Sequence, residues 1–326
     1  MIESIKISVS SLPVQQMKNK KILLIISYTL GSSFITIFQR YLTFYFDSFT
    51  QNFYRYLAGS LSLLLISFLF YPEDLKEILK NMNLIGKIAL LAGLVAVAQS
   101  FFIEGLAYTS AMVTGFISTL GLPLTIVLAV LIFPAEKEIA RGKNFLLGFF
   151  LAFAGTIGFI LGKGSISLEY SLGILFLIIG TAISVFITLL LKRLVIKLNP
   201  VCVSALLTFF MCFFFFISGL IWGDLSKIRH VSSFTNFILF ASGVYGLIFG
   251  INLVFVNLKI SGILVTKIAE LTIPVFTALF AFIFLKESLN ILQTFFGMVI
   301  LIGSLIAVLI SAKEKTIFGE YNETKD

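Results

Sequence analysis

Residues 261–286 read SGILVTKIAELTIPVFTALFAFIFLK and combine the length of a membrane span with charges in its interior. A helix rising about 1.5 Å per residue crosses about 30 Å of hydrocarbon in roughly 20 residues, which places Glu270 near mid-depth and Lys267 one turn away. A charge there costs roughly 2.5–3.5 kcal/mol on insertion scales, so each side chain requires a partner. Their spacing puts both on one helix face, and Pro274 leaves the Glu270 carbonyl without its helical donor. We therefore expect the functional site in this segment.

The same pattern occurs earlier in the chain, at a constant offset of 151 residues. The matched pairs are Ser110 with Ser261, Ile117 with Ile268, Leu120 with Leu271, Pro123 with Pro274, and Glu136 with Glu287. One proline falls in the middle of each copy, so Pro123 and Pro274 are the candidate hinge or broken-helix positions. Apolar segments rich in small residues follow both copies, at residues 146–162 and 297–312. The pattern predicts a duplicated unit of five spans.

Composition places the chain in a membrane. The mean hydropathy is +1.06, 59% of the residues are hydrophobic and only 12% are charged, which describes an outer surface facing lipid. The net charge of +8 would suit a nucleic-acid partner, but the basic residues lie between apolar spans and form no patch or stripe. We therefore expect the protein to lie in the lipid bilayer and not to bind nucleic acid.

The predicted fold is an all-α polytopic membrane protein with ten transmembrane helices in two five-helix repeats. The predicted spans are residues 22–38, 49–70, 84–107, 111–133, 145–161, 170–191, 201–222, 234–256, 262–285 and 289–311. The predicted units are an N-terminal tail at 1–20, a first repeat at 21–162, a second repeat at 163–312 and a C-terminal tail at 313–326.

The distribution of Lys and Arg predicts the topology. With a cytoplasmic N-terminus, seventeen of the 24 basic residues fall in inside segments and five in outside segments, leaving Arg55 and Lys267 within spans. This bias favours a cytoplasmic-membrane protein with both termini inside. Because each repeat has an odd number of spans, the second copy enters the membrane from the opposite side, and the repeats are inverted. Inverted repeats are typical of alternating-access transporters.

Two segments carry a family resemblance. They are GLAYTSAMVTGFISTLGLPLTIVLAVLIFPAEK at residues 105–137 and VNLKISGILVTKIAELTIPVFTALFAFIFLKESLNILQTFFGMVILIGSLIAVL at residues 256–309. Their mid-span prolines, the glutamates just past each span and Gly297 resemble the EamA-type branch of the drug/metabolite transporter superfamily, and Arg55 resembles that family's span-two arginine. The resemblance covers nearly the whole chain. It implies ten helices around a central cavity built from both halves, and export or exchange of small metabolites, most commonly amino acids.

The pair within the ninth predicted span has two functional interpretations. Lys267 and Glu270 could bind the carboxylate and ammonium of a zwitterion, or Glu270 could take and release a proton as the coupling ion. The structural alternative is an ion pair that locks the span against its neighbours, although buried pairs often add little net stability. The pair is a feature of this sequence and is not carried over from the family.

Other polar residues within spans are also candidates for substrate binding or coupling. Glu104 lies near the outer end of its span and could either face the cavity or reach water. Gln99 could line the cavity or bond a neighbouring helix. Arg55, two turns inside its span, could bind a substrate anion, or anchor the topology by reaching the interface or pairing with Asp47. Asn252 and Tyr245 share one stripe and could face the cavity or join helices.

We expect a secondary transporter that moves a small polar, amino-acid-like metabolite by proton coupling or exchange. It is not expected to be an enzyme or to hold a metal or cofactor, since Asp residues occur only outside the predicted spans and the single His230 lies in a loop. A lipid or isoprenoid-phosphate flippase is the alternative, with Arg40 and Arg55 as its candidate rim residues; a membrane-embedded enzyme is a weaker one. Both a monomer and a homodimer fit the Phe-rich surface.

The topology prediction can be tested with a reporter that is active only in the cytoplasm, fused to either end of the chain. We expect activity from both fusions, because an even number of spans returns the chain to the side on which it began. Fusions that place the two ends on opposite sides of the membrane would rule out inverted five-span repeats.

Overall fold

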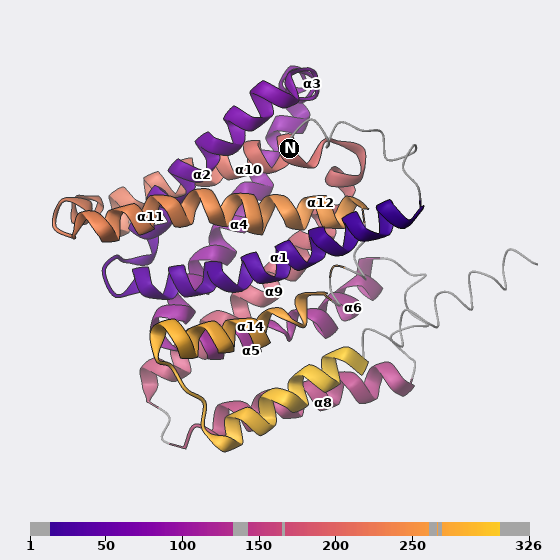
Figure 1. Ribbon diagram of the computed structural model, residues 1–326, viewed down its shortest axis with the longest axis vertical. Coiled ribbons are helices and arrows are strands. Elements are labelled where there is room, and N and C mark those ends of the chain that lie inside the picture. Colours follow the sequence, from indigo (N-terminus) through magenta and orange to yellow (C-terminus); the bar gives the residue numbers. More distant parts are fainter. Residues whose placement is uncertain (1–13, 133–142, 165–166, 261–265, 267–268, 307–326) are drawn as a thin grey trace, which may run out of the picture.

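A computed structural model describes residues 14–132, 143–164, 167–260, 266 and 269–306. All regular secondary structure in these residues is helical, as expected for an all-α protein. The helices run side by side across a layered bundle (Figure 1). Helix α1 (Val14–Thr43) passes through its middle and packs against α11 on one side and α14 on the other.

The elements follow the apolar segments of the sequence. In the first half α1 is followed by α2 (Ser48–Phe70), α3 (Pro72–Lys80), α4 (Met82–Tyr108), α5 (Ala111–Ser118), α6 (Gly121–Ile132) and α8 (Lys143–Leu161). The second half contains α9 (Leu168–Lys197), α10 (Pro200–Trp222), the 3₁₀ helix η4 (Leu225–Arg229), α11 (Ser233–Gly246), the π-helix η5 (Leu247–Asn252), α12 (Leu253–Ile260), α14 (Ile273–Phe280), the π-helix η6 (Ala281–Leu285) and a last helix, Ile291–Ile306.

Several helices have the character of membrane spans. Among the described residues, five helical stretches are long and apolar enough to cross a bilayer: Ser48–Phe70, Met82–Tyr108, Leu168–Leu191, Pro200–Trp222 and Ser233–Ile260. Shorter apolar helices accompany them. Large apolar side chains such as Phe213, Leu220 and Phe237 point outward and are more than half exposed, which suits a surface covered by lipid. The chain is therefore a polytopic helical membrane protein.

Polar residues between the apolar runs begin the helices. The Asp47 carboxylate accepts a hydrogen bond from the Thr50 amide at 2.9 Å at the start of α2. Ser110 caps α5 in the same way, accepting from the Val113 amide at 3.2 Å. Such caps satisfy amides that lack an intrahelical partner, so they fix where each helix enters the bundle.

Helix α3 was not expected from the sequence, where these residues were a linker between two spans. Pro72 begins it, Glu73 and Asp74 fall in its first turn, and Leu75 and Ile78 are buried. Proline suits a first helical position and acidic residues suit a helix N-terminus. The nine-residue helix is too short to cross a bilayer, and it packs on α2 and α4 (Figure 1).

Two helices are interrupted at corresponding places, one residue apart on the offset of 151. A turn at Thr119–Leu120 separates α5 from α6, and a turn at Leu271–Thr272 precedes α14. The Thr119 hydroxyl donates to the Phe116 carbonyl at 2.6 Å, and the Thr272 hydroxyl donates to the Ala269 carbonyl at 2.8 Å. Each of these carbonyls also accepts the backbone amide of the same threonine, at 3.2 Å and 3.0 Å, so the hydroxyls add a second donor at each turn. Pro123 and Pro274 follow in the first turn of the next helix, where a missing N–H has little cost.

Helices α2 and α11 cross in close contact at two glycines. A Cβ on Gly59 would lie 2.5 Å from the Gly243 carbonyl oxygen, and a Cβ on Gly243 would overlap the backbone of Arg55. Only glycine, whose side chain is a single hydrogen atom, allows the two helices to come this close. The crossing therefore sets the position of Arg55 in the bundle.

We expect Gly243→Ala to separate these helices, because the added methyl meets backbone atoms that cannot move aside. Overpacking of this kind typically costs about 1–3 kcal/mol. Thermal unfolding in detergent should show a lowered midpoint. Gly86→Ala is the matched control, since a Cβ there meets nothing within 4 Å and alanine favours the helix. Equal midpoints for the two variants would contradict the close crossing.

Candidate functional site

Two adjoining cavities lie between helices of both halves of the chain. The first, of about 360 Å³, is lined by Arg55 and is called the Arg55 cavity; the second, of about 300 Å³, is lined by Glu270 and is called the Glu270 cavity. They share the wall residues Ser32, Thr36, Phe102, Thr188 and Val254. Cavities of this size suit small metabolites.

The Glu270 cavity is built around the two interrupted helices. Helices α5 and α14 meet at Gly115, where a Cβ would lie 3.3 Å from Pro274 Cα. The Tyr28 hydroxyl of α1 donates to Glu270 Oε1 at 3.1 Å. Thr277 also lines this cavity, and its hydroxyl is buried without a hydrogen-bond partner. The arrangement presents a carboxylate and several hydroxyls to a ligand.

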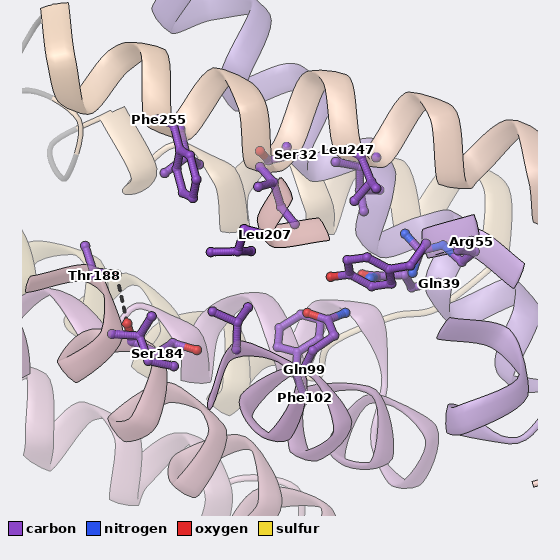
Figure 2. Close-up of a pocket in the computed structure, with 18 of the residues that line it drawn as sticks. Ser32, Gln39, Arg55, Gln99, Phe102, Ser184, Thr188, Leu207, Leu247 and Phe255 are labelled. Carbon is purple, nitrogen blue, oxygen red and sulfur yellow. Dashed lines mark hydrogen bonds between the residues drawn. The ribbon is translucent and has the colours of Figure 1, made fainter. Parts of the chain in front are cut away.

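The Arg55 cavity holds a buried guanidinium. Arg55 is only 4% exposed, and its Nε donates to the Ser242 hydroxyl at 3.2 Å. Its Nη1 has no hydrogen-bond partner. The Gln39 and Gln99 side chains also line this cavity, from α1 and α4 (Figure 2). Gly246 leaves room for the guanidinium, since a Cβ there would lie 3.1 Å from Nη2.

A cluster around Arg40 and Glu287 closes one end of the bundle. Arg40 Nε lies 3.4 Å from Glu287 Oε1, and its Nη1 donates to the carbonyls of Leu106 at 3.0 Å and Ala107 at 2.8 Å. The two Glu287 carboxylate oxygens accept from the first two amides of α5, each at 3.2 Å. This Arg40–Glu287 cluster joins the end of α1, the end of α4, the start of α5 and the chain after η6. It thus ties the first half to the second.

The structure brings some predicted residues to the cavities and not others. Gln99 and Arg55 line one cavity, and Glu270 and Pro274 line the other. Pro123 lies in α6, outside both linings. Lys267 falls outside the described residues.

Three predicted residues lie elsewhere. Glu104 accepts from the Ser48 hydroxyl at 2.5 Å and lines a separate hollow beside Trp222. Asn252 accepts from the Ser204 hydroxyl at 3.1 Å, joining η5 to α10. The Tyr245 ring stacks on Phe249 with centroids 4.8 Å apart. None of the three lines the Arg55 or the Glu270 cavity.

Of the alternatives considered for Arg55, the structure does not show the pairing with Asp47. Asp47 caps α2 and lies 3.6 Å from Lys227 Nζ. Arg55, two turns further along α2, turns into the bundle, where Ser242 binds it. The guanidinium is therefore buried at the cavity wall, eight residues along α2 from Asp47.

Helix α1 contributes cavity residues that were not among those predicted from the sequence. Tyr28, Ser32, Thr36 and Gln39 all line the cavities. Their spacings of four, four and three residues follow one helix face, and this polar stripe within an apolar span is a sequence signal for a cavity-lining face.

No three His, Cys, Asp or Glu side chains gather as candidate metal ligands within the described part of the chain.

Comparisons with known proteins agree with this architecture. Residues 19–161 and 171–309 each match the model of the EamA-like transporter family. A protein from Haemophilus influenzae, described as an uncharacterized transporter, is 27% identical over 281 residues, which cover 84% of this chain and 92% of that protein. A protein of known crystal structure aligns with 90% of this chain and over 98% of its own length. The TM-score is 0.57 and the sequence identity is 15%. The last likeness concerns the fold alone. The family matches span both halves, so the chain belongs to the EamA-like transporter family.

Proposed function

We propose that this protein is a secondary active transporter that moves a small polar, amino-acid-like metabolite across the cytoplasmic membrane by alternating access, with proton coupling or exchange. The observation that carries the proposal is the Glu270 carboxylate, bound by Tyr28 within a cavity formed by two interrupted helices. Irregular backbone at membrane depth is tolerated where it lines such a cavity, and transporters bind substrates and coupling ions at such helix breaks.

The proposed architecture is ten spans in two inverted repeats, residues 21–162 and 163–312. Its support is the correspondence of the two helix breaks, which fall at Thr119–Leu120 and Leu271–Thr272. Two halves with equivalent breaks can exchange conformations at small energetic cost. Opening would then alternate between the two sides of the membrane around one fixed set of cavities.

In this arrangement the Arg40–Glu287 cluster is the closed outer end. It joins the two proposed repeats through one ion pair and two bonds from backbone amides to Glu287, while Arg40 also bonds two backbone carbonyls within the first repeat. Opening toward the outside requires Glu287 to leave the amides of α5. Closure is favoured because the carboxylate neutralises Arg40 and also caps a helix N-terminus.

Glu270 has two compatible tasks in this mechanism. As a carboxylate it can hold the ammonium of an amino-acid-like substrate, and it can also carry a proton between the two sides. The Tyr28 hydroxyl donates its hydrogen to this carboxylate. Protonation weakens this bond and the attraction for an ammonium, which would couple substrate release to proton uptake.

The surroundings of Arg40 and Arg55 do not favour the flippase alternative. A flippase needs basic residues at the rim of its cavity to hold a lipid phosphate. Arg40 is engaged by Glu287 and by two carbonyls, and Arg55 lies deep within the bundle.

The test is uptake, efflux and counterflow in proteoliposomes with radiolabelled amino acids, nucleotides and sulfonium metabolites. Glu270→Gln should abolish pH-driven uptake, because the amide cannot exchange a proton. Tyr28→Phe should reduce uptake by about tenfold, the effect of one bond to a charged group. Tyr54→Phe is the matched control, since its hydroxyl bonds the Leu225 carbonyl outside both cavities. Unchanged counterflow and pH-driven uptake in Glu270→Gln would refute the assignment of Glu270.

A further inference from the structure

We propose that Arg55, with the amides of Gln39 and Gln99, forms a binding station for a carboxylate on a substrate with an apolar body. The inference rests on the proposed function and adds to it the chemical class of the substrate. It also assigns the substrate anion to a place distinct from Glu270.

The first support is the state of the guanidinium. Arg55 is buried, and one of its terminal nitrogens, Nη1, has no hydrogen-bond partner. The salt bridges among the described residues are Arg40–Glu287 and Lys227–Asp47, and neither neutralises Arg55. Burying a charge without a counter-charge destabilises the folded protein. Here that unpaired charge lies at the wall of a cavity. A carboxylate ligand would remove it.

The second support is the donor geometry around the charge. A guanidinium presents a planar fork that matches a carboxylate through two parallel hydrogen bonds. Ser242 holds Nε from the side of α11, which leaves the terminal nitrogens for a ligand. Gln39 and Gln99 face the same cavity from α1 and α4 (Figure 2), and their amide groups add donors.

The third support is the character of the remaining wall. The remaining wall combines hydroxyl side chains, such as Ser184 and Thr188, with a larger number of aliphatic and aromatic ones, among them Val95, Leu207, Leu247 and Phe255. Such a wall binds apolar surface and repels additional charge. The occupant that fits is a carboxylate attached to an aliphatic or aromatic body.

The position of Glu270 separates the two charged stations. Tyr28, which binds Glu270, and Gln39, which lines the Arg55 cavity, are eleven residues apart on α1. This corresponds to about 16 Å along the helix axis. The ammonium and carboxylate of an α-amino acid share one carbon atom, so we assign the two groups to the two stations in turn. A substrate would therefore pass from one station to the other through the shared wall at Ser32 and Thr36.

Ligand-induced thermal stabilisation of the purified full-length protein tests the station. The probes are 3-phenylpropanoate and 3-phenylpropanamide, which differ in the carboxylate alone, together with phenylalanine and phenylalaninamide. We expect the carboxylates to bind at least about tenfold more tightly than the amides. Arg55→Gln should reduce this preference to about one. Arg55→Lys should retain part of it, because a lysine keeps the charge but loses the fork.

Arg229→Gln is the matched control, since Arg229 lies in η4 and lines neither cavity; it should keep the full preference. The proposal is overturned if no carboxylate stabilises the wild-type protein, or if the preference persists in Arg55→Gln. Counterflow of the same carboxylates in liposomes separates the two hypotheses. Arg55-dependent binding without flux would contradict the transport function but support the carboxylate station at Arg55. Flux without any preference for carboxylates would support transport but contradict the station.

Discussion

Within a bilayer a backbone amide or carbonyl cannot be left facing hydrocarbon, and the rest of this structure depends on that constraint. An unbroken helix meets the constraint by itself, whereas a broken one meets it only where protein or a cavity surrounds the break. Both interruptions in the described chain have this protection. Thr119 and Thr272 supply hydroxyls to the carbonyls at the breaks, and α1 runs past α5 and α14 through the middle of the bundle (Figure 1). The cavity beside Glu270 follows from this packing.

The charged residues within the bundle differ in the hydrogen bonds and ion pairs that they form. Arg40 and Glu287 neutralise each other and also bind backbone carbonyls and amides, so they hold one arrangement of helices. Arg55 keeps an unpartnered nitrogen at a cavity wall. Glu270 contacts a tyrosine hydroxyl beside the second cavity. We infer that the satisfied cluster stabilises a conformation, whereas the residues at the cavity walls act on the ligand.

Much of this arrangement could be predicted because sequence periodicity and duplication record it directly. The offset of 151 residues located both mid-span prolines, and the charges within spans singled out Arg55 and Glu270. The α1 stripe was overlooked because hydroxyl residues are common as helix glue within apolar spans. The surroundings of Glu104, Asn252 and Tyr245 depend on which helices meet, as does the true partner of Asp47. One sequence does not specify those contacts, since lipid-facing and cavity-facing sides have similar hydropathy.

The central claim is that one set of cavities is reached from each side of the membrane in turn. Thr36 lines both cavities, so a single cysteine at this position, with Cys202 and Cys212 replaced by alanine, reports on them directly. The measurement is labelling by a membrane-impermeant thiol reagent in right-side-out and inside-out vesicles. The account predicts labelling from both sides, slowed on both by a transported substrate. Labelling from one side only, under all conditions of substrate and pH, would contradict it.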